Sequence, residues 1–161
     1  MIRQCRAGDA QRMYFIINKA AEAYEGVIPA DRYRQPYMSM ESLKGEMERV
    51  TFYGWEAEGE LVGIMGMEPI KNIALIRHVY VLPEWQRQGI ASRLLDHIKH
   101  LFTGSRLLVG TWADVSWAIS FYQKHGFRLL PDKDQLLETY WDIPRHQIET
   151  SVVLGIDNIQ A

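Results

Sequence analysis

The residues whose types and spacing best suit a chemical role lie between His78 and Ala91. Their pattern predicts a strand, a short loop and the first turn of a helix. The first backbone N–H groups of a helix have no partner within it, and the helix dipole adds partial positive charge there. A loop that enters a helix can therefore bind the oxygens of a phosphate or a pyrophosphate.

The side chains of this loop suit an anion as well. Gly89 and the small Ala91 let the main chain approach a ligand closely. Arg87 adds a full positive charge, and Gln86 and Gln88 supply neutral donors. Because glycine and arginine are also common in ordinary tight turns, these residue types alone indicate only an anion at the start of a helix.

Two motifs resemble those of the GNAT superfamily of acyl-CoA N-acyltransferases. The first is Gln86-Arg87-Gln88-Gly89-Ile90-Ala91, which is similar to the family's Gln/Arg-x-x-Gly-x-Gly/Ala signature and follows a Val-x-Pro strand end. The second lies in residues 118–127 and resembles the family's Tyr-x-x-x-Gly-Phe pattern, here from Tyr122 to Phe127. Two motifs in the family's order at a suitable separation favour membership more strongly than either motif alone.

The resemblance implies that the chain binds acetyl-CoA as an acyl-donor cosubstrate, without a metal, and passes its acetyl group directly to a primary amine. In this family the pantetheine arm fills the gap between two splayed strands and bonds to their main chain. Here those main-chain groups would belong to Val79, Tyr80 and Val81, and one amide would stabilise the oxyanion. The pyrophosphate would lie on the loop and the first helical turn, on Gln86, Arg87, Gln88, Gly89, Ile90, Ala91 and Ser92.

The resemblance also implies a catalytic role for Tyr122. This residue corresponds to a family tyrosine that lies near the sulfur and protonates the departing thiolate as a general acid. On spacing alone, a tyrosine packed on a helix face would be the commoner outcome. Family members often have an asparagine seven residues earlier that holds the pantetheine arm, whereas this chain has Val115, so one cofactor contact is missing or replaced.

The acceptor amine needs a base, because an alkylamine with a pKa of about 10.4 is protonated at neutral pH. Glu68 is the acidic residue best placed by its order, although a surface glutamate in an ion pair fits equally well. Strand alternation places Arg77 on the side of Val79 and His78 on the side of Tyr80. Arg77 would then either face the acceptor and favour a carboxylate-bearing amine, or pair with an acid. His78 is interpreted as a core residue that is close enough to the site to be tested as a base.

Aromatic residues lie in or beside the segments that would flank the acceptor. They are compatible with an apolar or aromatic acceptor. The interpretation that they merely cover the core has more weight, because aromatic residues dominate the buried area of any small domain. These residues are Tyr24, Tyr33, Trp112, Trp117, Tyr140 and Trp141.

The elements that must position these residues alternate along the chain. We expect strands over residues 2–6, 52–57, 61–67, 73–82 and 106–109, from 127, and over 148–156. We expect helices after the N-cap Asp9, from Ser39 or Ser42, after Pro83 with Ile90, Leu94, Ile98 and Leu101 on one side, and over residues 117–125. With the resemblance, this order predicts an α/β (α+β) fold of three layers in a single domain over residues 1–161. Its central sheet would be mixed, mostly antiparallel and of about seven strands, with helices on both faces and a long polar connection over residues 131–147.

Composition excludes several other classes. With 18 basic and 20 acidic residues the net charge is -2, so no overall positive field exists for nucleic acid or an anionic membrane. The single cysteine, Cys5, cannot form a disulfide within the chain. No signal region opens the sequence, and no apolar run approaches the roughly 20 residues of a membrane helix. We therefore expect a cytoplasmic protein.

Two other functions stay open at this point. A non-catalytic acyl-CoA-binding sensor or partner module would keep the loop and lack turnover, in line with the absent asparagine and the unassigned base. A nucleotide-binding protein has little support, because the chain has no Gly-x-x-x-x-Gly-Lys-Ser/Thr loop. The sequence does not identify the acceptor, which is either a small molecule or a protein amine. It also does not identify the preferred acyl chain or the oligomeric state. Exposed sheet edges are compatible with a homodimer.

Overall fold

Strands and covering helices make up each of the two compact units into which a computed structural model divides the chain. The model describes residues 1–157. The first unit comprises residues 1–69 and 76–102, and the second comprises residues 70–75 and the described residues from 103 onward. A single domain over residues 1–161 stays a prediction, and its last four residues lie outside the described range.

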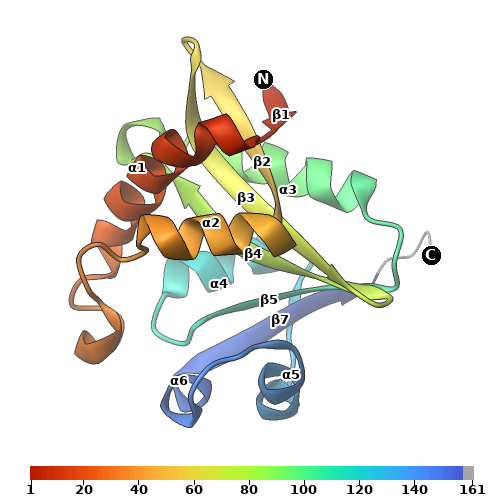
Figure 1. The fold of residues 1–161 in the computed structure, drawn as a ribbon. Helices are drawn as coiled ribbons and strands as arrows, with labels where there is room; N and C mark the ends of the chain where they lie inside the picture. The colour runs from red at the N-terminus through yellow and green to blue at the C-terminus, as the bar shows by residue number, and fades with distance from the viewer. Residues whose placement is uncertain (158–161) are drawn as a thin grey trace. The chain divides into compact units, whose positions relative to one another are not determined.

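The first unit contains four strands in the order β1-β2-β3-β4. They are β1 (Ile2–Gln4), β2 (Thr51–Ala57), β3 (Glu60–Ile70) and β4 (Ile73–Val81), of which the last two extend into the second unit. The helices are α1 (Ala10–Ala20), α2 (Met40–Arg49) and α3 (Ile90–Leu101), with short 3₁₀ turns η1 (Ala7–Asp9), η2 (Ala21–Tyr24), η3 (Ala30–Arg32) and η4 (Pro83–Trp85) (Figure 1). β2 pairs with β1 and with β3 in antiparallel register.

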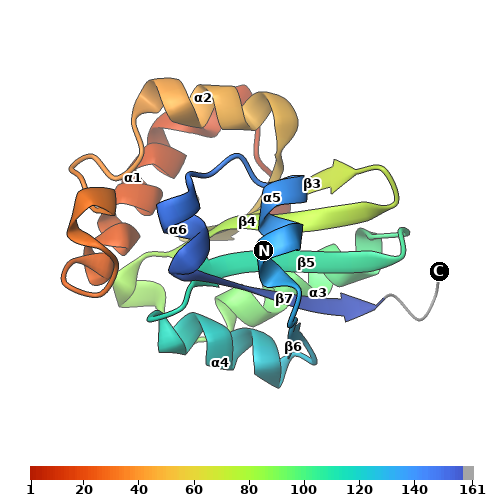
Figure 2. The ribbon, with the colours of Figure 1, turned by 90° about the horizontal axis from the view of Figure 1, so that it is seen from below.

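Alternation along β2 directs successive side chains to opposite faces. The ring of Phe52 stacks on His78 at 5.8 Å, on the face that α2 covers. Tyr53 meets His97 of α3 at 5.2 Å on the other face, and the Trp55 ring lies 5.2 Å from the guanidinium of Arg93 in α3. Helices therefore cover both faces of this unit, with α1 and α2 on one face and α3 on the other (Figure 2).

Apolar stripes at helical spacing hold these helices against the strands. The buried residues of α1 are Ala10, Met13, Ile16, Ile17 and Ala20, and those of α3 are Ile90, Leu94, Leu95 and Ile98. Ser39 caps α2 by accepting from the N–H of Ser42 at 3.1 Å, as expected for one of the two predicted starts. Leu101 was predicted to face inward but is 46% exposed, because it is the last residue of α3 and an exposed turn follows it.

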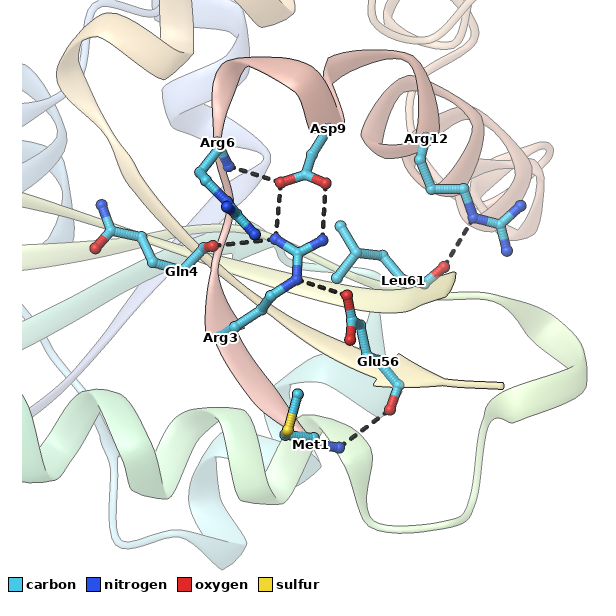
Figure 3. A network of polar contacts seen from close by, with 8 residues as sticks. All are labelled: Met1, Arg3, Gln4, Arg6, Asp9, Arg12, Glu56 and Leu61. Carbon is cyan, nitrogen blue, oxygen red and sulfur yellow. Dashed lines mark hydrogen bonds and ion pairs between the residues drawn. The ribbon is translucent and has the colours of Figure 1, made fainter. Parts of the chain in front are cut away.

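A network of ion pairs fastens β1 to the start of α1 (Figure 3). Both terminal nitrogens of Arg3 donate to the carboxylate of Asp9 at 2.8 Å, and its Nε donates to Glu56 at 2.7 Å. The N–H of Arg6 donates to the same Asp9 carboxylate at 2.7 Å. Asp9 therefore occupies the predicted N-cap position of α1 but makes no side-chain cap to that helix, because its oxygens serve Arg3 and Arg6.

In the second unit, β5 (Arg106–Trp112) and β6 (Arg128–Leu129) pair antiparallel with β7 (Ser151–Asp157). Its helices are α4 (Ser116–Lys124), α5 (Lys133–Tyr140) and α6 (Arg145–Glu149). The prediction of a polar connection over residues 131–147 is wrong, because α5 and most of α6 lie there. Leu137 and Ile148 join a buried cluster with Leu108 and Val153, so a few apolar contacts suffice to fix these polar helices.

The strand order over both units is β1-β2-β3-β4-β5-β7-β6. The predicted α/β fold with a mixed seven-stranded sheet is confirmed. None of the helices within residues 1–157 has the length and apolar character to cross a membrane.

Candidate active site

The loop between β4 and α3 has the backbone of an anion-binding site. Gly89, the N-cap residue of α3, has a φ of +81°, and Arg87 has a φ of +64°. A Cβ atom added at Gly89 would meet no atom within 4 Å, so space is open at this point of the main chain. The N–H of Arg93 donates to the Gly89 carbonyl at 3.0 Å and closes the first turn. The earlier N–H groups of that turn have no partner within the helix.

The predicted cofactor residues of the loop lie together in the first unit. Gln86, Arg87 and Gln88 are exposed, and Nε2 of Gln86 donates to the Val81 carbonyl at 3.1 Å. Ile90 is buried and approaches Gly63 of β3 so closely that a Cβ atom there would lie 3.0 Å from it. Its side chain therefore anchors the helix start, which leaves only its main chain for a ligand. Ala91 and Ser92 are half-buried.

The predicted main-chain contacts of β4 belong to residues whose side chains are packed. Tyr80 is 7% exposed, and its ring lies 6.4 Å from the ring of Tyr24, which lies 5.4 Å from Tyr37. Burial raises the pKa of Tyr80 well above its ordinary value, and burial together with the neighbouring Tyr37 raises the pKa of Tyr24 to about 12. The hydroxyls of Tyr80 and Tyr24 therefore stay protonated at neutral pH. The side chains of Val79 and Val81, on either side of Tyr80, are half-buried.

Glu68, the predicted base, lies in a charged cluster made by Glu46, Arg49, Glu68, Arg77 and His78. Arg77 donates to Oε1 of Glu68 at 2.9 Å, and Nε of Arg49 lies 3.7 Å from Oε2. A guanidinium group therefore faces each carboxylate oxygen, and the side chain is 15% exposed. The ion pair foreseen as the alternative for Glu68 and Arg77 is present, and a role of Glu68 as base stays a prediction.

Glu46 is a member of the cluster that the sequence reasoning missed. Its Oε1 lies 2.8 Å from Arg49 and 3.9 Å from Arg77, and its Oε2 lies 3.3 Å from Nε2 of His78. Burial acts to raise the pKa of Glu46, but His78, Arg77 and Arg49 outweigh it and hold that pKa at about 2. Glu46 is therefore ionised at neutral pH. The signal in the sequence that could have identified Glu46 is its position three residues after Leu43. Residues three apart lie on the same side of a helix, and Leu43 faces the core.

The predicted alternation of Arg77 and His78 is wrong in part. Both side chains reach Glu46 of α2, whereas strict alternation would have placed them on opposite faces. The cause is the backbone of His78, whose φ of +58° is left-handed and interrupts the regular strand. The ring of His78 packs on Phe52, as expected for a core residue.

Tyr122 belongs to the second unit, whereas the loop and the charged cluster belong to the first. Tyr122 is 4% exposed, and its ring contacts Phe121 and Phe127 at centroid distances of 5.1 and 5.5 Å. Val115, at the position of the family's asparagine, is fully buried and precedes α4 without a side-chain cap. An apolar side chain thus fills this position.

The aromatic residues predicted near an acceptor have different surroundings. Trp112 is buried, and Trp117 is 50% exposed. Tyr140 and Trp141 pack against the apolar cluster of the second unit. In the first unit, the rings of Tyr33 and Tyr37 lie 6.3 Å apart. Most of these rings cover the core, as the alternative interpretation held.

Comparison with known proteins agrees with this geometry. Residues 48–129 match the family model described as an acetyltransferase (GNAT) domain. The chain is similar in structure to PaiA N-acetyltransferase from Thermoplasma acidophilum in complex with coenzyme A, with a TM-score of 0.75, 18% identity and 98% of each chain covered. It is also similar to the ribosomal-protein-S18-alanine N-acetyltransferase of Escherichia coli, with a TM-score of 0.74 and 17% identity over 100% of this chain and 95% of that one. A GNAT family acetyltransferase from Elizabethkingia anophelis with acetyl-CoA bound has a TM-score of 0.63 and 22% identity, over 98% and 97% of the two chains.

Proposed function

Because the chain belongs to the GNAT acetyltransferase family, we propose that it transfers the acetyl group of acetyl-CoA directly to a primary amine. The observation that carries this proposal is the open, left-handed backbone at Gly89, at the start of α3 and beside the exposed Arg87. Structures of similar fold hold coenzyme A or acetyl-CoA, which supports this donor. The acceptor is an amine of a small molecule or a protein.

The main chain from Gln86 to Ser92 would hold the pyrophosphate of the donor. Backbone N–H groups at a helix start bind phosphate oxygens without a buried counter-charge. The net charge of the protein is -2, so no overall positive field attracts the donor. Arg87 supplies a positive charge locally, at the loop. Main-chain groups of Val79, Tyr80 and Val81 would hold the pantetheine arm, and no metal takes part.

Tyr122 is the proposed general acid, which donates its phenolic proton to the departing thiolate. Burial against Phe121 and Phe127 fixes the orientation of its ring. Glu68 is the base predicted from the sequence, but the two arginines that face its oxygens would have to be displaced before it could take a proton.

The test is a panel of amines with detection of free coenzyme A, run on the wild-type protein. Transfer predicts release of coenzyme A that depends on one class of amine. Binding of acetyl-CoA without release of coenzyme A would instead support the second candidate, a non-catalytic acyl-CoA sensor or partner module. The observation that favours this candidate is the buried Val115 at the position of the family's asparagine. A cytoplasmic location and a homodimer stay predictions.

A further inference from the structure

The half-buried side chains of His78 and Glu46 face each other, and the proposed function gives neither of them a role. Their Nε2 and Oε2 atoms lie 3.3 Å apart, and the side chains are 14% and 16% exposed. Both atoms are shielded from solvent, and their alignment falls short of a hydrogen bond. Buried polar atoms usually have partners, so a donor and an acceptor this close are poised to bond to each other.

The charge of Glu46 decides which ring nitrogen of His78 carries hydrogen. An ionised carboxylate only accepts hydrogen bonds, and the guanidinium groups of Arg49 and Arg77, 2.8 and 3.9 Å from its Oε1, favour the ionised form of Glu46. If Nε2 also presented a lone pair, two buried acceptors would face each other at 3.3 Å and repel. Nε2 therefore carries a hydrogen, and the neutral ring has its lone pair on Nδ1.

The backbone places that nitrogen on the strand of the proposed donor site. Nδ1 is the ring nitrogen nearest to its own main chain, and residue 79 begins the β4 segment proposed for the pantetheine arm. The φ of +58° at His78 is unusual for a residue other than glycine, and such strained positions occur often at functional sites. Stacking on Phe52 holds the plane of the ring.

We propose that His78 takes the proton of the acceptor's ammonium group at Nδ1, and that Glu46 is a positioning residue that fixes the tautomer of the ring. This inference rests on the proposed transfer reaction and names its base. The charged groups around the ring are Glu46 and Arg49 from α2, Glu68 from β3 and Arg77 from β4. The charges of the two carboxylates and the two guanidinium groups cancel. When the ring takes a proton, the imidazolium therefore faces the carboxylate of Glu46, and the cluster as a whole carries no large excess charge.

The proton balance of the step is complete. The ammonium gives one proton to Nδ1 of His78, directly or through a water, and the free amine attacks the thioester carbonyl. The C–N bond forms, the C–S bond breaks, and the thiolate takes a proton from the general acid. The amide nitrogen loses its second proton, which restores that acid, and the imidazolium releases its proton to solvent. The net products are the N-acetyl amine, coenzyme A and one proton.

The first test needs no acceptor. In protein labelled with ¹⁵N-histidine, the ring signals of His78 are identified by their loss in His78→Asn, a variant chosen because asparagine tolerates left-handed φ. The expected neutral ring has its hydrogen on Nε2, in the wild type and in the control Glu48→Gln, whose site on α2 is exposed. A neutral ring with its hydrogen on Nδ1 would overturn the inference.

The second test measures kcat/KM against pH with an amine that the wild type acetylates. His78→Asn should lower kcat by roughly 10²-fold or more and flatten the acidic limb, with the KM for acetyl-CoA unchanged. His78→Gln serves as the second variant if His78→Asn does not fold, and His100→Gln on the exposed side of α3 is the control. Glu46→Gln should lower kcat less than His78→Asn does, and in the first test it should give a mixture of the two neutral tautomers, because its amide can donate to Nε2 as well as accept from it.

The outcomes separate the two proposals. If no amine of the panel makes the wild type release coenzyme A, the proposed function is contradicted. A wild type that turns over, with an unchanged acidic limb in His78→Asn and a limb lost in Glu68→Gln, overturns the inference alone and assigns the base to Glu68.

Discussion

At the scale of single residues, the carboxylate of Asp9 is held in its charged form by identifiable partners. Asp9 accepts from both terminal nitrogens of Arg3 and from the N–H of Arg6. The bond from Arg3 outweighs the opposing effect of burial, and with the N–H of Arg6 it lowers the pKa of Asp9 from 3.8 to about 2. Such charge-assisted, two-point contacts have more directional character than an ordinary surface pair.

Asp9→Asn tests this network. The folded protein holds the Asp9 pKa below its unfolded value, so its contribution to stability is complete above pH 3.8 and is lost as the pH falls toward about 2. The substitution should lower the free energy of unfolding at neutral pH by about 1 kcal/mol, or Tm by about 2–4 °C. It should also weaken the dependence of Tm on pH in that acidic window. Asp114→Asn, at an exposed site, is the control; equal acid sensitivity of both variants would contradict the assignment.

Tyr122→Phe tests the proposed acid. Loss of the hydroxyl should lower kcat by roughly 10²-fold while the affinity for acetyl-CoA stays within about twofold, because the ring and its packing remain. Steady-state kinetics and a binding titration measure the two effects. Tyr53→Phe, whose ring packs on α3, is the matched control. If Tyr122→Phe keeps wild-type kcat, the hydroxyl has no part in the chemistry.

Residue identities predicted the loop between β4 and α3 but not the charged cluster of Glu46, Arg49, Glu68, Arg77 and His78. The spacing of Gly89, Arg87 and the helix start is local, so the sequence predicts it directly. The pairing of Glu46 with His78 joins α2 to β4, and the left-handed turn at His78 violates the alternation from which its direction was inferred. A contact of this kind depends on tertiary packing, which no local pattern encodes.

At the scale of elements, β3 approaches β4 closely because Gly66 has no side chain. A Cβ atom there would lie 2.6 Å from Cγ1 of Val50 and 2.9 Å from the carbonyl oxygen of Arg77, next to His78. Because the second of these atoms belongs to the backbone, the strain cannot be relieved by a rotamer change alone. The close approach therefore supports the unusual backbone of the following residue.

Gly66→Ala and Gly45→Ala should change stability in opposite directions. The first should lower the free energy of unfolding by about 1–3 kcal/mol through overpacking. The second should raise it by about 0.5–1 kcal/mol, because Gly45 lies within α2 with no atom within 4 Å of an added Cβ. Chemical denaturation measures both, and the account is contradicted if Gly66→Ala is the more stable variant.

The elements also show where sequence patterns succeed. β2, β3 and β4 were predicted to within a few residues, since their apolar alternation and the turn at Glu58-Gly59 are strong local signals. The helices α5 and α6 were missed, because few residues between 131 and 147 are buried and polarity there resembles a loop. Their stability comes from contacts of Leu137 and Ile148 with distant strands.

At the scale of the whole molecule, the net charge of -2 means that an anionic donor must be bound by local geometry. The main chain at Gly89 offers such geometry, because it is open at the start of α3. The central claim is therefore that acetyl-CoA binds the folded protein through this loop, and a ligand that binds only the folded state raises its stability.

Thermal unfolding with and without saturating acetyl-CoA tests this claim, in wild type, Gly89→Glu and Gly59→Glu. The two glycines have φ values of +81° and +80° and the same open surroundings, so both variants carry the same backbone strain, but Gly59 lies in the turn between β2 and β3. At about 100 times Kd the ligand adds roughly 2.7 kcal/mol, which raises Tm by about 5–10 °C. We predict this rise in wild type and Gly59→Glu and its loss in Gly89→Glu. No rise in wild type, or an equal rise in all three proteins, would contradict the account.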